Sequence, residues 1–183
     1  MSHDLPAELA RFARARIAEE LGAAPASRAE LDAICTECGA SFVTLHWDDG
    51  RLQGCIGSLE AVRALVDDVE RNALAAAFDD PRAVPITPGD LARLVVEVSV
   101  LSPLERVRFD GSEAGARSAL RVGTDGVLLV HGLRRGTFLP QMWAELGTPE
   151  NFLHELKRKA RLPPEFWSPD VELHRYTVAK GAA

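Results

Sequence analysis

A cysteine between two glycines is the most distinctive chemical feature of this sequence. It lies in the run Gly54-Cys55-Ile56-Gly57-Ser58, where a predicted strand meets a predicted helix. Glycines let the backbone approach a ligand closely, and the first amides of a helix favour an anion. A thiolate there would have a lowered pKa and act as a nucleophile or redox group, while the amides could hold an oxyanion. We therefore take Cys55 as the candidate catalytic residue and Gly54, Ile56, Gly57 and Ser58 as candidate ligand contacts. The structural alternative is a small buried hydrophobe, as free cysteines often are.

Two further polar side chains could orient a small anionic substrate. Arg82 follows Asp80-Pro81 just past a predicted helix end, where its guanidinium could clamp a carboxylate or a phosphate. The alternative for Arg82 is an ion pair with a neighbouring carboxylate. Gln141 follows Pro140 at a predicted strand-to-helix junction that mirrors Gly57-Ser58, and its amide can donate and accept at once. The alternative for Gln141 is a capping or solvent-exposed amide.

The sequence gives little support for a metal site, and it assigns no cofactor. Cys35-Thr36-Glu37-Cys38 is an isolated pair, whereas zinc needs four ligands. Cys55 with His46 would complete a Cys₃His set, but at no standard spacing, so the other interpretations are a redox pair or two reduced thiols. His131, beside Arg134-Arg135, could face Cys55 and act on its proton, and the alternative is a structural histidine whose hydrogen bonds are satisfied within the fold. The sequence contains no GxGxxG, phosphate-binding GxxxxGK, HExxH or GxSxG motif.

The elements that must position these residues follow from apolar periodicity and turn residues. In the first half the pattern predicts a helix over 5–21, a short helix over 28–36 and a hairpin of strands 41–47 and 51–57. A long helix follows, capped by Ser58 and ended by Asp80-Pro81. The half closes with a helical turn from Thr87-Pro88 and a strand over 94–101. The second half predicts strands over 127–131 and 136–139, helices from Pro140 and from Thr148-Pro149, and a strand over 171–178.

Both halves therefore run hairpin, helices, strand. This order predicts an α+β fold with repeated halves over about 39–102 and 122–178, which share an antiparallel sheet. A linker over 103–121, with a turn at 110–113 into a short helix, would join them within one domain over 1–183.

Composition narrows the class of protein further. The chain has 183 residues, of which 46% are hydrophobic and 26% charged, so it is not wholly disordered. Its formal net charge of −6 disfavours general binding to nucleic acid. No apolar run approaches the roughly 20 residues that span a membrane. Three cysteines are too few for a secreted disulfide scaffold, so we expect a reduced, cytoplasmic protein. The sequence does not fix the oligomeric state.

Several ordered blocks resemble the AMMECR domain family across residues 10–178. The run Leu52-Gln53-Gly54-Cys55-Ile56-Gly57 is similar to the Leu-Arg-Gly-Cys-Ile-Gly signature of that family. The other blocks are Phe42-Val43-Thr44-Leu45, Ala75-Ala76-Ala77-Phe78-Asp79-Asp80-Pro81-Arg82, Val96-Glu97-Val98-Ser99-Val100-Leu101, Gly136-Thr137-Phe138-Leu139-Pro140-Gln141, Phe152-Leu153 and Lys159-Ala160. The resemblance implies an α+β domain whose two repeated halves surround one antiparallel, barrel-like sheet, with the site at Gly54–Gly57.

The resemblance implies no established reaction. Bacterial and archaeal members of the family resemble parts of a set with a Memo-like protein, itself similar to extradiol dioxygenases, and a radical S-adenosylmethionine protein. Eukaryotic members resemble regulatory or interaction proteins. We therefore expect a component that binds a small ligand or a partner and acts with those two proteins. The alternative is a cysteine-dependent enzyme that uses Cys55 as nucleophile or redox thiol on a small anionic substrate. Binding is favoured because the sequence shows no acid–base partner for Cys55.

The sequence departs from the family pattern at several positions. Gln53 replaces the usual arginine, which removes a fixed charge near Cys55 and weakens the case for anion binding there. Ala83 stands where an aromatic residue commonly follows the Asp-Pro-Arg run, and Arg161 stands where the family often has glycine. A cysteine frequently found shortly before Lys159-Ala160 is absent, which excludes a mechanism with two cysteines at those positions.

Overall fold

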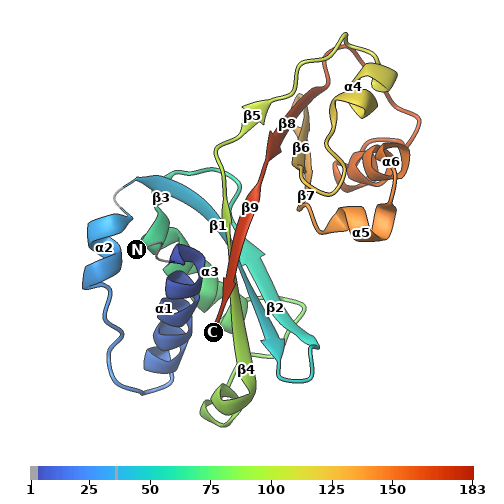
Figure 1. Ribbon diagram of the computed structural model, residues 1–183. Helices are drawn as coiled ribbons and strands as arrows, with labels where there is room; N and C mark the ends of the chain where they lie inside the picture. The colour runs from blue at the N-terminus through green and yellow to red at the C-terminus, as the bar shows by residue number, and fades with distance from the viewer. Residues whose placement is uncertain (1–3, 36) are drawn as a thin grey trace. The chain divides into compact units, whose positions relative to one another are not determined.

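A computed structural model describes residues 4–35 and 37–183, which form two units, each built on an antiparallel sheet. The first unit comprises the chain up to Ser102 together with Ala179–Ala183, and the second comprises Pro103–Val178 (Figure 1). The mixture of helices and antiparallel strands confirms the predicted α+β class.

The predicted hairpin supplies two strands of the first unit's sheet. The strands lie in the order β2-β1-β4-β9, and β3 pairs with the start of β1. Their bounds are Cys38–Trp47 for β1, Leu52–Gly57 for β2, Arg63–Ala64 for β3, Leu94–Leu101 for β4 and Val178–Ala182 for β9. In this register Thr44 of β1 pairs with Cys55 on one side and with Glu97 on the other. Gln53 is the extra residue of a β-bulge, because Leu45 pairs with Gly54 whereas His46 pairs with Leu52.

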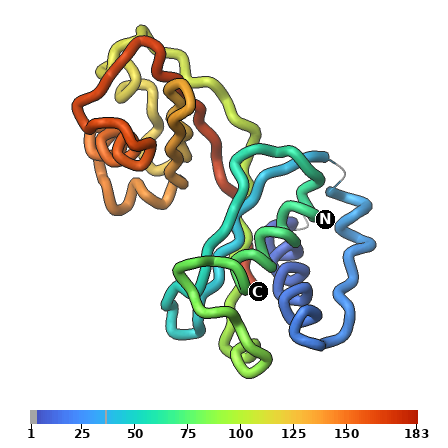
Figure 2. Tube along the Cα trace, turned by 180° about the vertical axis from the view of Figure 1, so that it is seen from behind, coloured from blue at the N-terminus to red at the C-terminus, as the bar shows by residue number. Residues whose placement is uncertain are grey.

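Helices cover one face of this sheet. The helices are α1 (Leu5–Glu20), α2 (Ala29–Ile34), α3 (Leu65–Phe78) and the 3₁₀ helix η1 (Pro88–Arg93). Strand alternation places Val43 and Leu45 of β1 in the core with Val96 of β4 and residues of α1 and α3 such as Ile17 and Val69. Figure 2 shows α1 and α3 lying together beside the strands of this unit. The opposite face of the sheet carries no described helix of the unit.

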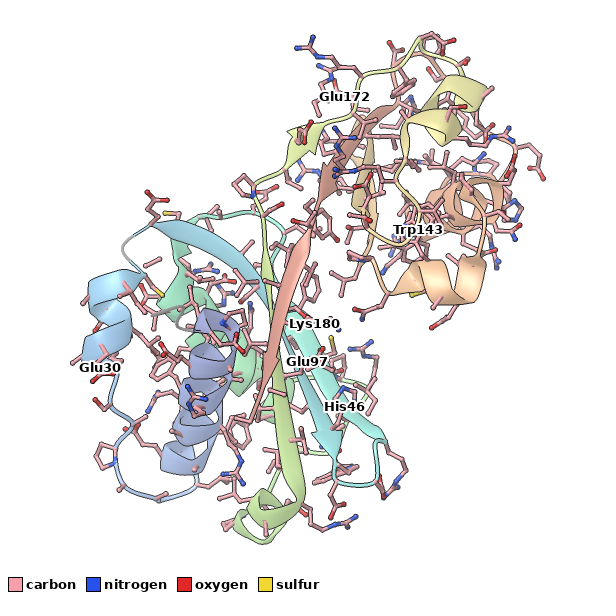
Figure 3. All side chains as sticks on the ribbon, viewed as in Figure 1. Glu30, His46, Glu97, Trp143, Glu172 and Lys180 are labelled. Carbon is pink, nitrogen blue, oxygen red and sulfur yellow. The ribbon has the colours of Figure 1, made fainter. Side chains whose placement is uncertain are left out.

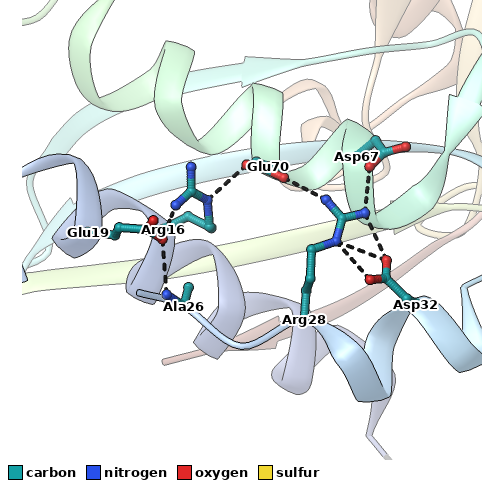
Figure 4. Close-up of polar contacts among 7 residues, drawn as sticks. All are labelled: Arg16, Glu19, Ala26, Arg28, Asp32, Asp67 and Glu70. Atoms are coloured by element: carbon teal, nitrogen blue, oxygen red, sulfur yellow. Dashed lines mark hydrogen bonds and ion pairs between the residues drawn. The ribbon is translucent and has the colours of Figure 1, made fainter. Parts of the chain in front are cut away.

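A cluster of ion pairs fastens the helices to one another. Arg28, at the start of α2, bonds to Asp67 and Glu70 of α3, and Arg16 of α1 bonds to Glu70 at 2.9 Å (Figure 4). Glu19 accepts hydrogen bonds from the amide of Ala26 and from Arg16, and these bonds, the Ala26 bond foremost, lower the pKa of the Glu19 carboxyl. The cluster therefore holds the segment between α1 and α2 against α3.

The second unit repeats the arrangement on a smaller scale. Its sheet has the order β5-β8-β6-β7. The elements are β5 (Glu105–Arg106), α4 (Glu113–Ala119), β6 (Gly126–His131), β7 (Arg134–Phe138), α5 (Met142–Leu146), α6 (Pro149–Lys159) and β8 (Glu172–Tyr176). Its core includes Leu129, Leu156 and Leu173, and the rings of Trp143 and Phe152 stack at 3.9 Å between centroids.

The same strand order recurs in both units. In each, a hairpin is followed by helices and then by a strand that pairs with the first hairpin strand, giving β2-β1-β4 and β7-β6-β8. Gly54, the third residue of β2, lies against Ala76 of α3, and Gly136, the third residue of β7, lies against Leu156 and Ala160 of α6. The predicted order of elements is therefore present in both halves.

Four expectations need correction. The single barrel-like sheet is wrong: the described chain forms two separate sheets, neither of them closed. The predicted strand over 171–178 is interrupted at Thr177, so β8 pairs with β6 in one sheet and β9 pairs with β4 in the other. The stretch 103–121 is more than a linker, because β5, α4 and the buried Val107 and Ala116 belong to the second unit.

The fourth correction concerns the helix after the hairpin. Its predicted cap, Ser58, lies seven residues before the first helical residue, Leu65. The Ser58 amide instead bonds to the carbonyl of Ser41, which prolongs the pairing of the hairpin, and its hydroxyl donates to Asp68 at 2.8 Å. The glycine-cysteine run is therefore not at a helix N-terminus, and the anion-binding amides expected there are absent from the described structure.

Candidate functional site

Cys55 lies on the face of the first sheet that is opposite to α1 and α3. Its neighbours in β2, Gly54 and Ile56, face the helices: Gly54 contacts the backbone of Ala76, and Ile56 packs on the core. Because side chains alternate along a strand, the Cys55 thiol points the other way. It is half-buried, and its Sγ lies 3.4 Å from the Oγ1 of Thr44 on the paired strand.

The backbone of Cys55 is fixed by the Asp-Pro-Arg run. Its amide donates to Asp80 Oδ2 at 2.9 Å, and its carbonyl accepts from Arg82 Nη2 at 2.9 Å. β2 is an edge strand, so these groups point away from β1 and would otherwise form an unpaired sheet edge. Because the backbone groups of Cys55 point away from β1, Thr44 and Cys55 form a non-hydrogen-bonded pair of the antiparallel ladder. Side chains approach each other closely in such pairs. Asp80 and Arg82 therefore act as positioning residues for Cys55.

Asp80 and Arg82 form a strong ion pair with each other. Arg82 Nη2 lies 2.7 Å from Asp80 Oδ2, and Arg82 Nε donates to Oδ1 at 2.9 Å. The side chain of Asp80 is only 1% exposed, whereas that of Arg82 is 66% exposed. The bonds from Arg82 and then from the Cys55 amide hold the pKa of the Asp80 carboxyl far below its ordinary value. Asp80 in turn raises the pKa of Arg82, so both groups are charged at neutral pH.

The two glycines of the run are explained by packing. A Cβ at Gly54 would lie 2.3 Å from the carbonyl oxygen of Ala76, so glycine lets β2 contact the backbone of α3. A Cβ at Gly57 would lie 2.2 Å from the ring of Phe42, which covers this glycine. With Ile56 in the core, Cys55 is the residue of this run whose side chain can meet a ligand on the sheet face.

A row of polar side chains continues from Cys55 across the sheet. Thr44 pairs with Glu97, and Glu97 accepts from Lys180 Nζ at 2.8 Å. Figure 3 shows Glu97 and Lys180 beside each other on β4 and β9. His46 lies two residues beyond Thr44 in β1 and so presents its imidazole on the same face. Sequence analysis missed this row, although Glu97 interrupts an otherwise apolar strand and could have indicated it.

A buried polar cluster behind the site was also missed. Asp68 of α3 is fully buried and accepts from the amide and hydroxyl of Ser41, from Ser58 and from Arg63, while Asn72 donates to it at 3.0 Å. The cluster links α3 to β1 and to the chain that follows β2. The signal was available in the sequence, because Asp68 and Asn72 are polar residues four apart on the otherwise apolar face of the helix.

The remaining candidates belong to the second unit or form no site. Gln141 is an exposed residue just before α5, and its side chain does not cap that helix. His131 packs against Phe166, with ring centroids 4.8 Å apart. Both residues are in the second unit, whereas Cys55, Thr44, Asp80 and Arg82 are all in the first.

The other two cysteines differ from Cys55 in exposure. Cys35 is buried, which raises the pKa of its thiol, and Cys38 is exposed. Both are free thiols, as is Cys55, and Thr36 between them lies outside the described residues. In the described chain no three His, Cys, Asp or Glu side chains gather closely enough to hold a metal ion. None of the described helices is long and apolar enough to cross a membrane.

Comparison with known proteins shows the family. The AMMECR1 family model matches residues 10–181, and this chain therefore belongs to the AMMECR1 family. A protein of Methanothermobacter thermautotrophicus is 38% identical over 180 residues, which cover 96% of this chain and 93% of that protein. A protein of Methanocaldococcus jannaschii is 34% identical over 169 residues, covering 91% of this chain and 84% of its own. The crystal structure of an uncharacterized protein from Pyrococcus horikoshii matches with a TM-score of 0.82 at 33% identity, covering 97% of this chain and 90% of that one.

Proposed function

We propose that this protein is a binding component whose contact surface is the face of the first sheet around Cys55. The observation that carries the proposal is that hydrogen bonds fix the backbone of Cys55 while its side chain lies on the sheet face away from the helices. Asp80 and Arg82 bond to its backbone amide and carbonyl, while its side chain is half-buried beside Thr44. A rigid edge strand that presents one polar row suits recognition of a small ligand or a partner protein.

Catalysis by Cys55 is the second candidate. It is favoured by the Thr44 hydroxyl, which lies 3.4 Å from Sγ and could donate a hydrogen bond to a thiolate. It is disfavoured by the lack of a base beside the sulfur. Among the described residues Thr44 hydrogen-bonds to Sγ and the Arg82 guanidinium interacts with Cys55 electrostatically, but neither group is a base that could take the thiol proton. The amide of Cys55, which could have held an oxyanion, is bonded to Asp80.

We propose a Memo-like protein and a radical S-adenosylmethionine protein as the partners. Support comes from membership of the AMMECR1 family and from the resemblance to family members that belong to such a set. A cytoplasmic location, expected from the cysteine content, is part of the same proposal.

The experiment measures binding with and without a covalent block of Cys55. A Cys35→Ser/Cys38→Ser chain is treated with iodoacetamide, and its association with Memo-like and radical S-adenosylmethionine proteins from the same genome is measured by sedimentation. We expect the alkylated chain to lose association. A Cys55→Ser version treated identically is the matched control and should keep it. Equal association of blocked and unblocked chains would refute the binding surface.

The same materials separate the two candidate functions. Binding predicts that Cys55→Ser retains both association and any activity of the three-protein mixture, because serine keeps the size and polarity of the position. Catalysis predicts that Cys55→Ser associates normally but abolishes that activity, with the folded state intact by circular dichroism.

A further inference from the structure

A hollow in the second unit is lined almost wholly by cations. It has a volume of about 640 Å³ and lies between the β6–β7 turn and the end of α6. Its described lining residues are Leu133, Arg134, Arg135, Lys159, Ala160 and Arg161, four of which are cationic and none acidic. The whole chain carries a net charge of −6, so this concentration of positive charge runs against the overall balance.

Bonds between the two segments fix the walls of the hollow. Arg134, the first residue of β7, donates from Nη1 to the backbone carbonyl of Arg161 beyond α6. The Lys159 ammonium lies 4.7 Å from the centroid of the Phe138 ring, which places it against the sheet. Gly136 of β7 lets the two backbones approach, because a Cβ there would lie 2.8 Å from the amide nitrogen of Ala160. The turn and the helix end therefore form one rigid surface.

Arg161 occupies a backbone position that normally selects glycine. Its φ is +59°, and among the described residues it is the one non-glycine residue with positive φ. The amides of Arg161 and Leu162 bond to the carbonyls of Arg158 and Lys157, which is the Schellman arrangement at a helix C-terminus. The chain uses glycine at comparable positions, such as Gly147 after α5. An arginine in a strained backbone position on the wall of a cationic hollow points to a role for its side chain.

We propose that this hollow binds a small phosphorylated molecule with at least two negative charges. Arginine guanidinium groups match phosphate oxygens with paired hydrogen bonds, and Lys159 adds a compact charge. The volume is that of a small-molecule site. Leu133 at the tip of the turn is fully exposed and supplies an apolar contact for the organic part of the ligand. A long polyanion is disfavoured because the rest of the chain would repel it. All its lining residues belong to the second unit, whereas Cys55 belongs to the first.

The test uses inorganic pyrophosphate as the probe and isothermal titration calorimetry as the readout. We expect the full chain to bind pyrophosphate, and Arg161→Gly to weaken that binding about tenfold or more. Glycine is the preferred residue at this backbone position, so Arg161→Gly should fold at least as well as the parent chain. The matched control is Arg158→Ser, which removes an equal charge from a residue of α6 outside the hollow that is paired with Glu155.

Three outcomes would overturn the proposal. The first is no heat of binding for the full chain with millimolar pyrophosphate. The second is an equal loss of affinity in Arg161→Gly and Arg158→Ser, which would indicate general electrostatic attraction. The third is binding of an RNA oligonucleotide or of anionic phospholipid vesicles in the absence of pyrophosphate binding, because either would assign the surface to a large polyanion.

Discussion

Asp80 and Arg82 act on Cys55 through its main chain. Asp80 accepts the Cys55 amide, Arg82 donates to the Cys55 carbonyl, and the two side chains pair with each other. Sequence analysis placed Arg82 beside the site as a ligand clamp and named an ion pair as the alternative. The ion pair is present, between Arg82 and Asp80. The Arg82 side chain is still largely exposed to solvent, so its role in binding a ligand stays a prediction.

Removing the charge of Asp80 should destabilise the fold. We expect Asp80→Asn to lower the free energy of unfolding by about 1–3 kcal/mol, because the buried carboxylate accepts charge-assisted hydrogen bonds that a neutral amide makes more weakly. The loss is limited because its partner Arg82 is largely exposed to solvent. Urea denaturation at pH 7 measures the change. Asp79→Asn is the matched control, since Asp79 is exposed, and it should stay within about 0.5 kcal/mol of the parent chain. Equal effects of the two variants would contradict this role for Asp80.

The lowered pKa of Asp80 predicts a pH dependence of stability. The folded state stabilises the ionised form of Asp80, so the pKa of this carboxyl is lower in the folded protein than in the unfolded chain, where an aspartate has a pKa of about 3.9. The contribution of Asp80 is therefore fully present above about pH 5 and is lost as the pH falls below about 4. We expect the stability difference between the parent chain and Asp80→Asn to shrink over that range in urea titrations. A constant difference from pH 7 to pH 3 would contradict the assignment.

Arg161 gives a prediction of opposite sign. Arg161→Gly should raise the free energy of unfolding by about 1 kcal/mol, because glycine carries no Cβ penalty at φ +59°. Thermal and urea denaturation measure the change. A loss of stability in Arg161→Gly would show that contacts of the arginine side chain outweigh its backbone strain.

At the scale of elements, Gly54 allows strand β2 of the hairpin to pack directly against the backbone of α3. A Cβ there would press on the Ala76 carbonyl, and neither backbone segment can move without disturbing the core. We expect Gly54→Ala to cost about 2–3 kcal/mol by overpacking. Gly89→Ala is the control, because its Cβ would meet Thr87 at an ordinary 3.9 Å. A tolerated Gly54→Ala, with urea midpoints equal for both variants, would contradict the close contact of β2 and α3.

Local patterns predicted most elements but not the start of α3. The β-branched and aromatic residues of 41–47 and the turn residues that follow them were enough to predict the hairpin. The helix expected from Thr148-Pro149 does begin there, with the Thr148 hydroxyl accepting from the Asn151 amide. Ser58 also has the residue type of a cap. Its hydroxyl is taken by Asp68, a partner ten residues away that local periodicity could not reveal.

At the scale of the whole molecule, two sheets replace the one expected. The repeated order of elements could be predicted from the sequence, because each hairpin and each helix is a local feature. Assignment of β8 and β9 to different sheets could not, because it depends on pairing with β6 and β4, which are far away in sequence. The candidate site follows the same rule. Cys55 and Arg82 could be proposed from their residue types and sequence positions, and they remain predictions, whereas Thr44 and Glu97 join them only through strand register.

The central claim is that the Cys55 thiol is presented by the folded protein on the face of its first sheet. The most direct measurement is the rate of iodoacetamide modification of a Cys35→Ser/Cys38→Ser chain at increasing urea concentration. We predict complete modification in the absence of urea, at a rate that stays constant until the unfolding transition. A chain that resists modification below the transition, and reacts only in step with its unfolded fraction, would contradict the claim.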